Sequence, residues 1–297
     1  MWYYLLILVS IAMFGAGFGL QDLYRKRRGS GIRISMESAC IGGAAGLIVL
    51  LFINGFSFSV TGFTVLMAAL SAINSLLFTF CAFKALDYIN LSLFSVFTML
   101  GGMVLPFLQG ILFYGEAFTL PKIICVIFIC AALLCTVEKG EKKRGIFFYI
   151  GIFVLNGMSG VISKLYIESE LPKLDAAGYS VWCAVAVVVL SGICWFVLSY
   201  KERKAQDSTA PKIEKPALWQ SYGIGALQGS INRVANFLLV LALAHVDASV
   251  QYPMVTGGTM IVSTIISFFG EKKPSLREII SVVLAFSGML ALFLSPA

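Results

Sequence analysis

An arginine and two asparagines lie in the middle of a long apolar segment. Within residues 218–244, Asn232, Arg233 and Asn236 stand where leucine would be expected. Placing an arginine at the centre of a membrane helix costs roughly 2.5–3.5 kcal/mol, so the side chain needs a partner. A guanidinium binds carboxylate or phosphate through paired N–H donors, and an amide offers a donor and an acceptor together. These side chains could therefore bind a polar, negatively charged solute.

Three kinds of partner for Arg233 are compatible with the sequence. All fifteen acidic residues lie near the ends of apolar segments or in loops, so none lies beside Arg233 in the middle of a segment. Arg233 would then bind an anionic substrate, or hydrogen-bond helix carbonyls and asparagines, or reach Asp22 or Glu37 at a segment end. Because the pKa of arginine exceeds about 12, this residue is not expected to relay protons.

Other apolar segments contribute polar side chains at similar depth. Asparagine and serine occur in two of them, and a third carries a stripe of polar residues that includes Tyr252 and Thr256. Residues of this stripe recur every three or four positions, which places them on one helix face. Such a face either lines a wet cavity or packs against a neighbouring helix through small residues. The predicted substrate-binding residues are Arg233, Asn232, Asn236, Asn74, Asn156, Tyr252, Thr256 and Ser71.

The composition identifies the elements that must position these residues. Of the 297 residues, 59% are hydrophobic and 12% are charged, whereas a soluble domain averages roughly 25% charged residues. The apolar residues form runs as long as a membrane helix requires, without the alternation of barrel strands. The prediction is an all-α polytopic membrane protein with ten transmembrane helices, at residues 2–23, 34–56, 61–83, 91–114, 118–137, 145–167, 176–200, 218–244, 248–269 and 276–295.

The basic residues are distributed unevenly between the two sides of the predicted membrane. Eighteen of the 22 lysines and arginines fall on one side, Lys122, Lys164 and Lys173 fall on the other, and Arg233 lies between. Because cytoplasmic loops carry the excess of Lys and Arg, the richer side is predicted to be cytoplasmic. An even number of helices then puts both termini outside. The net positive charge thus indicates topology and not a nucleic-acid surface, and the expected location is a bacterial inner (plasma) membrane.

The two halves of the sequence resemble each other. Residues 69–103 and 226–260 align at a constant offset of 157, and both stretches lead to a Gly-Glu pair, at Gly115-Glu116 and Gly270-Glu271. The eight identical positions are Ala69/Ala226, Leu70/Leu227, Phe80/Phe237, Ala85/Ala242, Leu86/Leu243, Ser92/Ser249, Gly101/Gly258 and Met103/Met260.

This similarity predicts two structural repeats. Residues 1–138 would form a first five-helix repeat, residues 139–145 a connecting cytoplasmic loop, and residues 146–297 a second five-helix repeat. Because five is an odd number, the second repeat must be inverted in the membrane. Inverted repeats are typical of transporters, in which the substrate site lies at the repeat interface near the midplane.

Two five-helix repeats, each with an Ala-Leu pair before a short polar turn, a Ser-rich helix and a Gly-Glu ending, resemble the drug/metabolite transporter superfamily. The closest type is similar to its ten-helix EamA-like members, and the resemblance covers nearly the whole chain. It implies alternating access around a central cavity lined mainly by the first, third, fourth, sixth, eighth and ninth helices. It implies no particular substrate, because relatives move amino acids, nucleotide sugars, choline, vitamins and drugs. The resemblance would imply that both termini lie inside, as in many relatives. The charge distribution of this sequence instead predicts that both termini lie outside.

Together these patterns predict a secondary transporter for a small polar metabolite that carries a carboxylate or phosphate, such as an amino acid. One alternative is a transporter of a zwitterion or cation through an aromatic cavity, with Arg233 in a structural role. Another is a flippase for a lipid or polyprenyl phosphate. Proton-coupled cation exporters among the small relatives rely on a glutamate in the middle of the first helix, and residues 5–20 contain none.

Other classes of function lack a motif in this sequence. The seven cysteines lie in apolar segments without a CxxC pattern, and the single histidine, His245, is at a segment end. Neither a metal site nor a disulfide framework is therefore expected. An enzyme is not expected either, because there is no Ser/His/Asp set and no phosphate loop. The expected partners are a small-molecule substrate and membrane lipids, with no cofactor and no nucleic acid, for a chain that acts as a monomer or a dimer.

Overall fold

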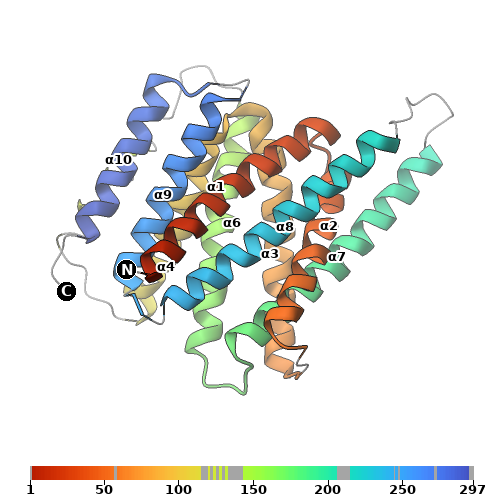
Figure 1. Ribbon diagram of the computed structural model, residues 1–297, viewed down its shortest axis with the longest axis horizontal. Coiled ribbons are helices and arrows are strands. Elements are labelled where there is room, and N and C mark those ends of the chain that lie inside the picture. The colour runs from red at the N-terminus through yellow and green to blue at the C-terminus, as the bar shows by residue number, and fades with distance from the viewer. Residues whose placement is uncertain are drawn as a thin grey trace.

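The chain folds into a bundle of long α-helices (Figure 1). The structure is a computed structural model that describes residues 2–56, 59–114, 120, 123–124, 127–128, 131–132, 143–205, 215–243, 245–246, 248–270 and 273–293. The helices of this part of the chain are α1 (Trp2–Arg28), α2 (Ile32–Ile53), α3 (Gly62–Tyr88), α4 (Leu91–Tyr114), α6 (Lys143–Glu168), α7 (Ala176–Ala205), α8 (Lys215–Leu243), α9 (Ala248–Phe268) and α10 (Leu276–Phe293). All regular secondary structure of the described residues is helical, which confirms the predicted all-α class.

Several of these helices are long and apolar enough to cross a membrane. By length and composition, the described residues contain five such spans, at Trp2–Arg28, Ile32–Ile53, Gly62–Tyr88, Gly145–Glu168 and Ala176–Glu202. Shorter apolar stretches lie in α4 and α9, at Leu91–Pro106 and Met254–Phe268. The chain is therefore a multi-pass helical membrane protein. Most of the fifth predicted segment, 118–137, and most of the predicted connecting loop, 139–145, lie outside the described residues.

Turn and capping residues set the boundaries of the helices. Gly29 follows α1 with a φ of +97°, a left-handed conformation that glycine adopts without a steric penalty. Its N–H donates to the carbonyl of Arg25 at 2.6 Å. Asn90 caps α4, where its Oδ1 accepts from the N–H of Leu93 at 2.9 Å. α1 continues to Arg28, beyond its predicted end at residue 23, because basic side chains in a last turn interact favourably with the helix dipole.

The helices pack in a pattern that recurs in the two halves of the chain. α1 packs against α8 and α9, and α6 packs against α3 and α4. α2 contacts α8 as α7 contacts α3, while α2 also contacts α7 and α4 contacts α9. Exchanging α1 with α6, α2 with α7, α3 with α8 and α4 with α9 therefore leaves this set of neighbours unchanged. α1 and α8 run side by side across the bundle, with α7 and α10 at opposite edges (Figure 1).

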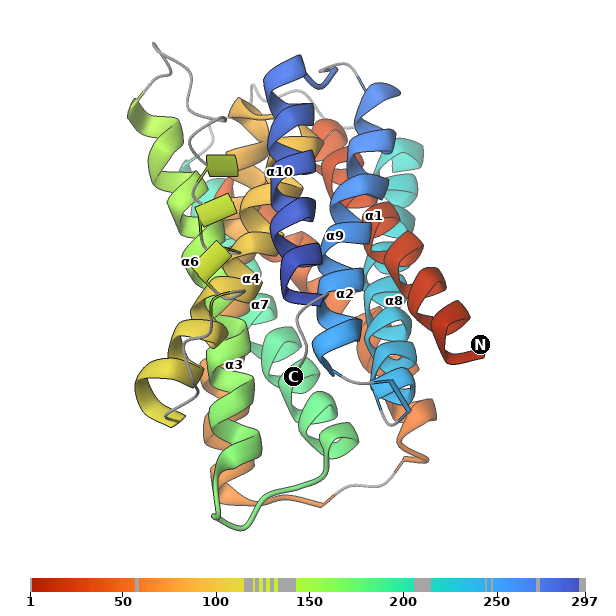
Figure 2. The same cartoon turned by 90° about the vertical axis from the view of Figure 1, so that its left-hand side faces the viewer.

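One end of the bundle, here called the basic end, holds a network of ion pairs. At the junction of α1 and α2, Nη2 of Arg28 lies 2.7 Å from Oε1 of Glu37, and both side chains are buried. Arg33 lies 3.6 Å from Glu37 and also pairs with Glu202 of α7 at 2.6 Å. The N-terminal end of α1 lies toward the opposite end, here called the terminal end (Figure 2). The network thus joins α1, α2 and α7 on the side where most of the positive charge is found.

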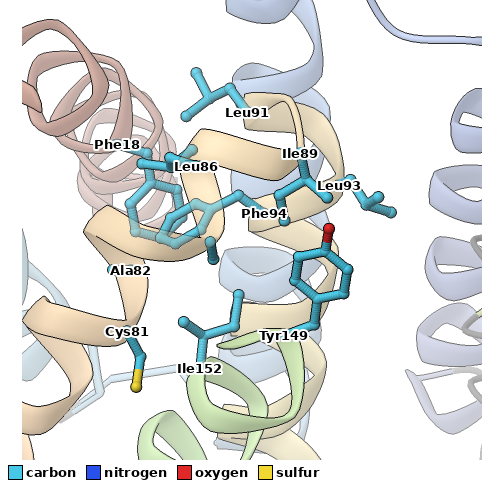
Figure 3. Packing of buried hydrophobic residues seen from close by; sticks show 11 residues of the cluster. Phe18, Cys81, Ala82, Leu86, Ile89, Leu91, Leu93, Phe94, Tyr149 and Ile152 are labelled. Atoms are coloured by element: carbon cyan, nitrogen blue, oxygen red, sulfur yellow. The ribbon is translucent and has the colours of Figure 1, made fainter. Parts of the chain in front are cut away.

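An apolar cluster lies just inside the basic end and joins four helices. Phe18 of α1, Leu86 of α3, Phe94 of α4 and Ile152 of α6 pack together, as Figure 3 shows. The rings of Phe18 and Phe94 meet edge to face with their centroids 5.2 Å apart. Because lipid tails are as apolar as these side chains, van der Waals packing holds such a cluster together.

The apolar residues of the terminal end fall into several separate clusters. Ile7 and Ile11 of α1 pack with Ala242 of α8. Met67 of α3 packs with Ile162 and Tyr166 of α6. Side chains of α1 and α8 therefore cluster apart from those of α3 and α6 at this end, whereas α1, α3, α4 and α6 share one cluster near the basic end.

Candidate functional site

A cavity of about 370 Å³ lies near the middle of the bundle, among α1, α2, α3, α4, α6, α7 and α8. Part of its lining is aromatic, from Phe14, Phe18 and Phe78. The remainder is largely polar, and Arg233 is the only charged residue among the described residues that line it. Five of the predicted substrate-binding residues meet here, namely Arg233, Asn232, Asn236, Asn74 and Asn156.

The guanidinium of Arg233 has no protein counter-ion in the described part of the chain. Neither of the two acidic residues that the sequence allowed as partners pairs with it. Asp22 pairs with Arg25 at 2.7 Å and with Lys26 at 3.2 Å. Glu37 is held by Arg28 and also accepts a hydrogen bond from the hydroxyl of Tyr24 at 2.7 Å. The arginine is half-buried and contributes one positive charge to the cavity.

Two of the asparagines bridge neighbouring helices while they line the cavity. Nδ2 of Asn74 on α3 donates to the carbonyl of Leu155 on α6 at 2.9 Å. Nδ2 of Asn156 on α6 donates to the carbonyl of Thr98 on α4 at 2.6 Å. Because each amide uses one N–H in this way, its orientation is fixed by the bundle. These residues therefore combine a structural contact with a place in the cavity lining.

The asparagines of α8 are arranged differently. Asn236 is exposed and its Nδ2 donates to the carbonyl of Asn232, one turn earlier, at 2.7 Å. Oδ1 of Asn232 is buried and has no hydrogen-bond partner among the described residues. Gln228, which the sequence analysis missed, also lines the cavity. Gln228, Asn232 and Asn236 are spaced four residues apart, which places the three amides on one helix face. This spacing in the sequence could have identified Gln228.

Glycines of three neighbouring helices make room for the polar residues. A Cβ atom at Gly17 of α1 would lie 2.5 Å from Oδ1 of Asn232, and one at Gly46 of α2 would lie 2.7 Å from Cγ of Arg233. A Cβ atom at Gly102 of α4 would lie 2.5 Å from Nδ2 of Asn156. Real Cβ contacts are longer than this, so each glycine provides space that its polar neighbour fills.

The other three predicted residues do not belong to the described lining of the cavity. Ser71 is half-buried on α3, and Thr256 is half-buried on α9. The side chain of Tyr252 lies outside the described residues, although its backbone is helical. Two further residues of the polar stripe of α9, Thr259 and Ser263, are fully buried inside the bundle, where Oγ of Ser263 donates to the carbonyl of Met260 at 3.0 Å.

A second cavity, of about 540 Å³, lies at the basic end between α1, α3, α4 and α9. Its charged residues include Asp22, Arg25 and Asp87, and these neutralise each other, since Nη1 of Arg25 lies 2.6 Å from Asp87. Within the described residues, no group of three His, Cys, Asp or Glu side chains is placed to hold a metal ion. The cavity beside Arg233 is therefore the stronger candidate for a binding site.

Comparison with known proteins places the fold but not the activity. No family model matches the sequence, and no curated protein matches it. A crystal structure of a protein is similar with a TM-score of 0.54 and 15% sequence identity, over 98% of this chain and 96% of that chain. At such low identity the likeness shows a shared fold alone. It extends over nearly the full length of both chains.

Proposed function

We propose that the protein is a secondary transporter that moves a small polar organic anion, bearing a carboxylate or a phosphate, by alternating access. One observation carries this proposal. Arg233 lines a cavity in the middle of a membrane bundle, and it has no protein counter-ion among the described residues. A desolvated guanidinium is costly unless an anion neutralises it. A bound substrate anion would supply the missing charge.

The arrangement of the helices supports an inverted repeat. The exchange of α1–α4 with α6–α9 preserves the main contacts between the two halves, namely α1 with α8 and α9, α6 with α3 and α4, α2 with α8, α3 with α7, α2 with α7 and α4 with α9. The cavity takes its lining from both halves, and substrate sites of inverted-repeat transporters lie at such an interface. On this basis the chain resembles the ten-helix EamA-like members of the drug/metabolite transporter superfamily, which we propose as its family.

The distribution of contacts supports a conformation that is closed at the basic end. On α1, Phe18 lines the cavity and packs in the apolar cluster, and Arg28 lies ten residues further along in the ion-pair network, roughly 15 Å away. At the terminal end, α1 and α8 cluster apart from α3 and α6. We therefore assign the network around Glu37 as the gate on the basic side, and substrate would enter from the terminal end.

The size and charge of the cavity disfavour the alternative functions. At about 370 Å³ it lies near the lower limit of small-molecule sites, which span about 300–1,000 Å³, so it suits a metabolite better than a lipid-linked phosphate. A cation would be repelled by Arg233, and the described lining offers no carboxylate to offset that repulsion. A zwitterion can still bind through its carboxylate and remains the second candidate.

A ligand panel on purified protein tests the proposed class. Thermal unfolding would be measured with millimolar anionic, zwitterionic and cationic metabolites, for the wild type, Arg233→Gln and Arg27→Gln. A ligand that binds the folded state raises the unfolding temperature according to its occupancy. We expect carboxylates or phosphates to stabilise the wild type and Arg27→Gln, and to lose about 10-fold or more in affinity for Arg233→Gln because a charge-assisted contact is removed.

The Arg27 variant is the matched control, because Arg27 is exposed at the basic end, where it donates to Gln220 at 3.2 Å. If cations stabilise all three proteins equally, the proposal is contradicted and Arg233 has a structural role. A lower unfolding temperature for Arg233→Gln without ligand, together with unchanged anion affinity, would have the same meaning.

A further inference from the structure

The charge of the cavity restricts the charge of its ligand. Arg233 supplies one positive charge, and the described lining residues add no other charge. In a site of low dielectric, an uncompensated charge is costly, so the bound state is most favourable when protein and ligand together are neutral. A monoanion meets this condition. A zwitterion leaves one positive charge behind, and a dianion leaves one negative charge.

The remaining polar groups restrict the rest of the ligand. Apart from Arg233, every polar side chain in the described lining is an amide or a hydroxyl, for example Gln228, Asn236 and Ser159. Thr98 also lines the cavity, and its Oγ1 is buried without a hydrogen-bond partner among the described residues. Amides and hydroxyls both donate and accept. They match hydroxyl groups, which also do both, better than an ammonium, which only donates and would lie near the guanidinium.

We propose that the substrate is a small hydroxylated monocarboxylate, of the sugar-acid type, with its carboxylate on Arg233 and its hydroxyls on the amides and hydroxyls of the surrounding helices. This inference rests on the proposed function and narrows it from polar anions in general to one class. The aromatic rings of Phe14 and Phe78 would cover the apolar C–H faces of the carbon chain. A six-carbon acid is compatible with a cavity of about 370 Å³.

A matched set of six-carbon compounds tests this assignment by calorimetric titration of the purified protein. Gluconate has one carboxylate and several hydroxyls; hexanoate, glucose and glucarate each change one of these properties, and norleucine differs from hexanoate by one ammonium. Hexanoate lacks the hydroxyls, glucose lacks the charge, glucarate adds a second carboxylate, and norleucine adds an ammonium. We expect gluconate to bind at least about 10-fold more tightly than the other four, because each of them leaves a charge or several hydrogen-bonding groups unmatched.

Two variants connect the ranking to named residues. Arg233→Gln is expected to weaken gluconate and hexanoate by a similar factor of about 10 or more, because both lose the same charge-assisted contact. Asn236→Leu is expected to weaken gluconate about 2–10-fold and to leave hexanoate unchanged, because a neutral hydrogen bond is lost. The exposed side chain of Asn236 bonds within its own helix, so this variant leaves the contacts between helices in place.

Each outcome supports or overturns the inference. If norleucine binds more tightly than gluconate and its binding depends on Arg233, the sugar-acid inference is wrong. The proposed function as a transporter of carboxylates would then still stand. Glucarate binding more tightly would overturn the single-charge argument, and hexanoate binding equally well would overturn the role of the hydroxyls. If none of the carboxylates binds while cations bind independently of Arg233, the proposed function itself fails. The wild-type ranking alone decides the glucarate and hexanoate cases even if the Arg233 variant does not fold.

Discussion

Glycine determines where the polar residues of this cavity can lie. Arg233, Asn232 and Asn156 each occupy space beside a glycine on an adjacent helix, and any larger residue there would overlap with the polar side chain. Membrane helices commonly use small residues for close approach of their backbones. Here the same device leaves room for long polar side chains within the bundle. The positions of the polar groups therefore depend on glycines that have no side chain to bind a ligand.

Replacement of Gly46 by alanine should displace Arg233. The new Cβ would lie 2.7 Å from Cγ of Arg233 and 3.3 Å from the carbonyl oxygen of Gly229. Overpacking of this kind costs about 1–3 kcal/mol, so we expect a lower unfolding temperature and weaker anion binding by calorimetry. Gly223→Ala on α8 is the matched control, since nothing lies within 4 Å of its added Cβ. Equal anion affinity in the two variants would contradict the role given to Gly46.

Pairs of helices from opposite halves cross where both have glycine. α2 and α8 meet at Gly42 and Gly229, where an added Cβ on Gly229 would lie 2.0 Å from the carbonyl oxygen of Gly42. α4 and α6 meet at Gly101 and Gly157, where an added Cβ on Gly157 would lie 2.6 Å from the Gly101 carbonyl oxygen. These two crossings flank the cavity.

The sequence predicted the faces of the helices better than their neighbours. Spacing of three or four residues identified Asn232 and Asn236 correctly as one face of α8. It could not distinguish this face from the stripe of α9, whose Thr259 and Ser263 are buried in the bundle. Periodicity describes a single helix, whereas the cavity depends on which helices surround each face. The contact between Gly46 and Arg233 could not be predicted for the same reason. A single glycine in an apolar segment does not indicate which residue of another helix lies beside it.

Loss of the carboxylate at Glu37 should loosen the basic end. Arg28 and Glu37 are buried with side-chain exposures of 4% and 1%, and removal of one partner from a buried pair costs about 3–5 kcal/mol. For Glu37→Gln we expect a lower unfolding temperature and faster hydrogen exchange in residues 20–40, with unchanged exchange at the terminal ends of α3 and α6. Glu202→Gln is the matched control, because its carboxylate is 56% exposed and such pairs contribute about 0–1 kcal/mol.

The hydrogen-exchange pattern decides whether this network is a gate. Faster exchange confined to the basic end of Glu37→Gln, with little change in Glu202→Gln, is the result expected of a closure that opens locally. Uniformly faster exchange over all helices would mean that the pair supports the whole bundle and would contradict the assignment of a gate.

At the scale of the whole molecule, the distribution of charge predicts one orientation in the membrane. The basic end contains the C-terminal end of α1, the N-terminal end of α2 and the C-terminal end of α7, whose ion pairs hold it together. Lys164 and Lys173 lie at the opposite end, with the N-terminus. If the basic end is cytoplasmic, the substrate entrance proposed at the terminal end faces the outside. The bundle then represents an outward-facing state of the proposed transport cycle.

Two cysteine substitutions at opposite ends of α7 test this orientation in intact cells. Lys173 precedes the helix and Lys204 is in its last turn, and both are exposed. The helix between them is about 40 Å long, which exceeds the hydrocarbon core of about 30 Å, so the two positions must lie on opposite sides of the membrane. We expect a membrane-impermeant maleimide to label Lys173→Cys in intact cells and Lys204→Cys only after permeabilisation, with the unsubstituted chain as background. The reverse pattern would place the basic end outside, against the excess of lysine and arginine there, and the closed gate would then face away from the cytoplasm.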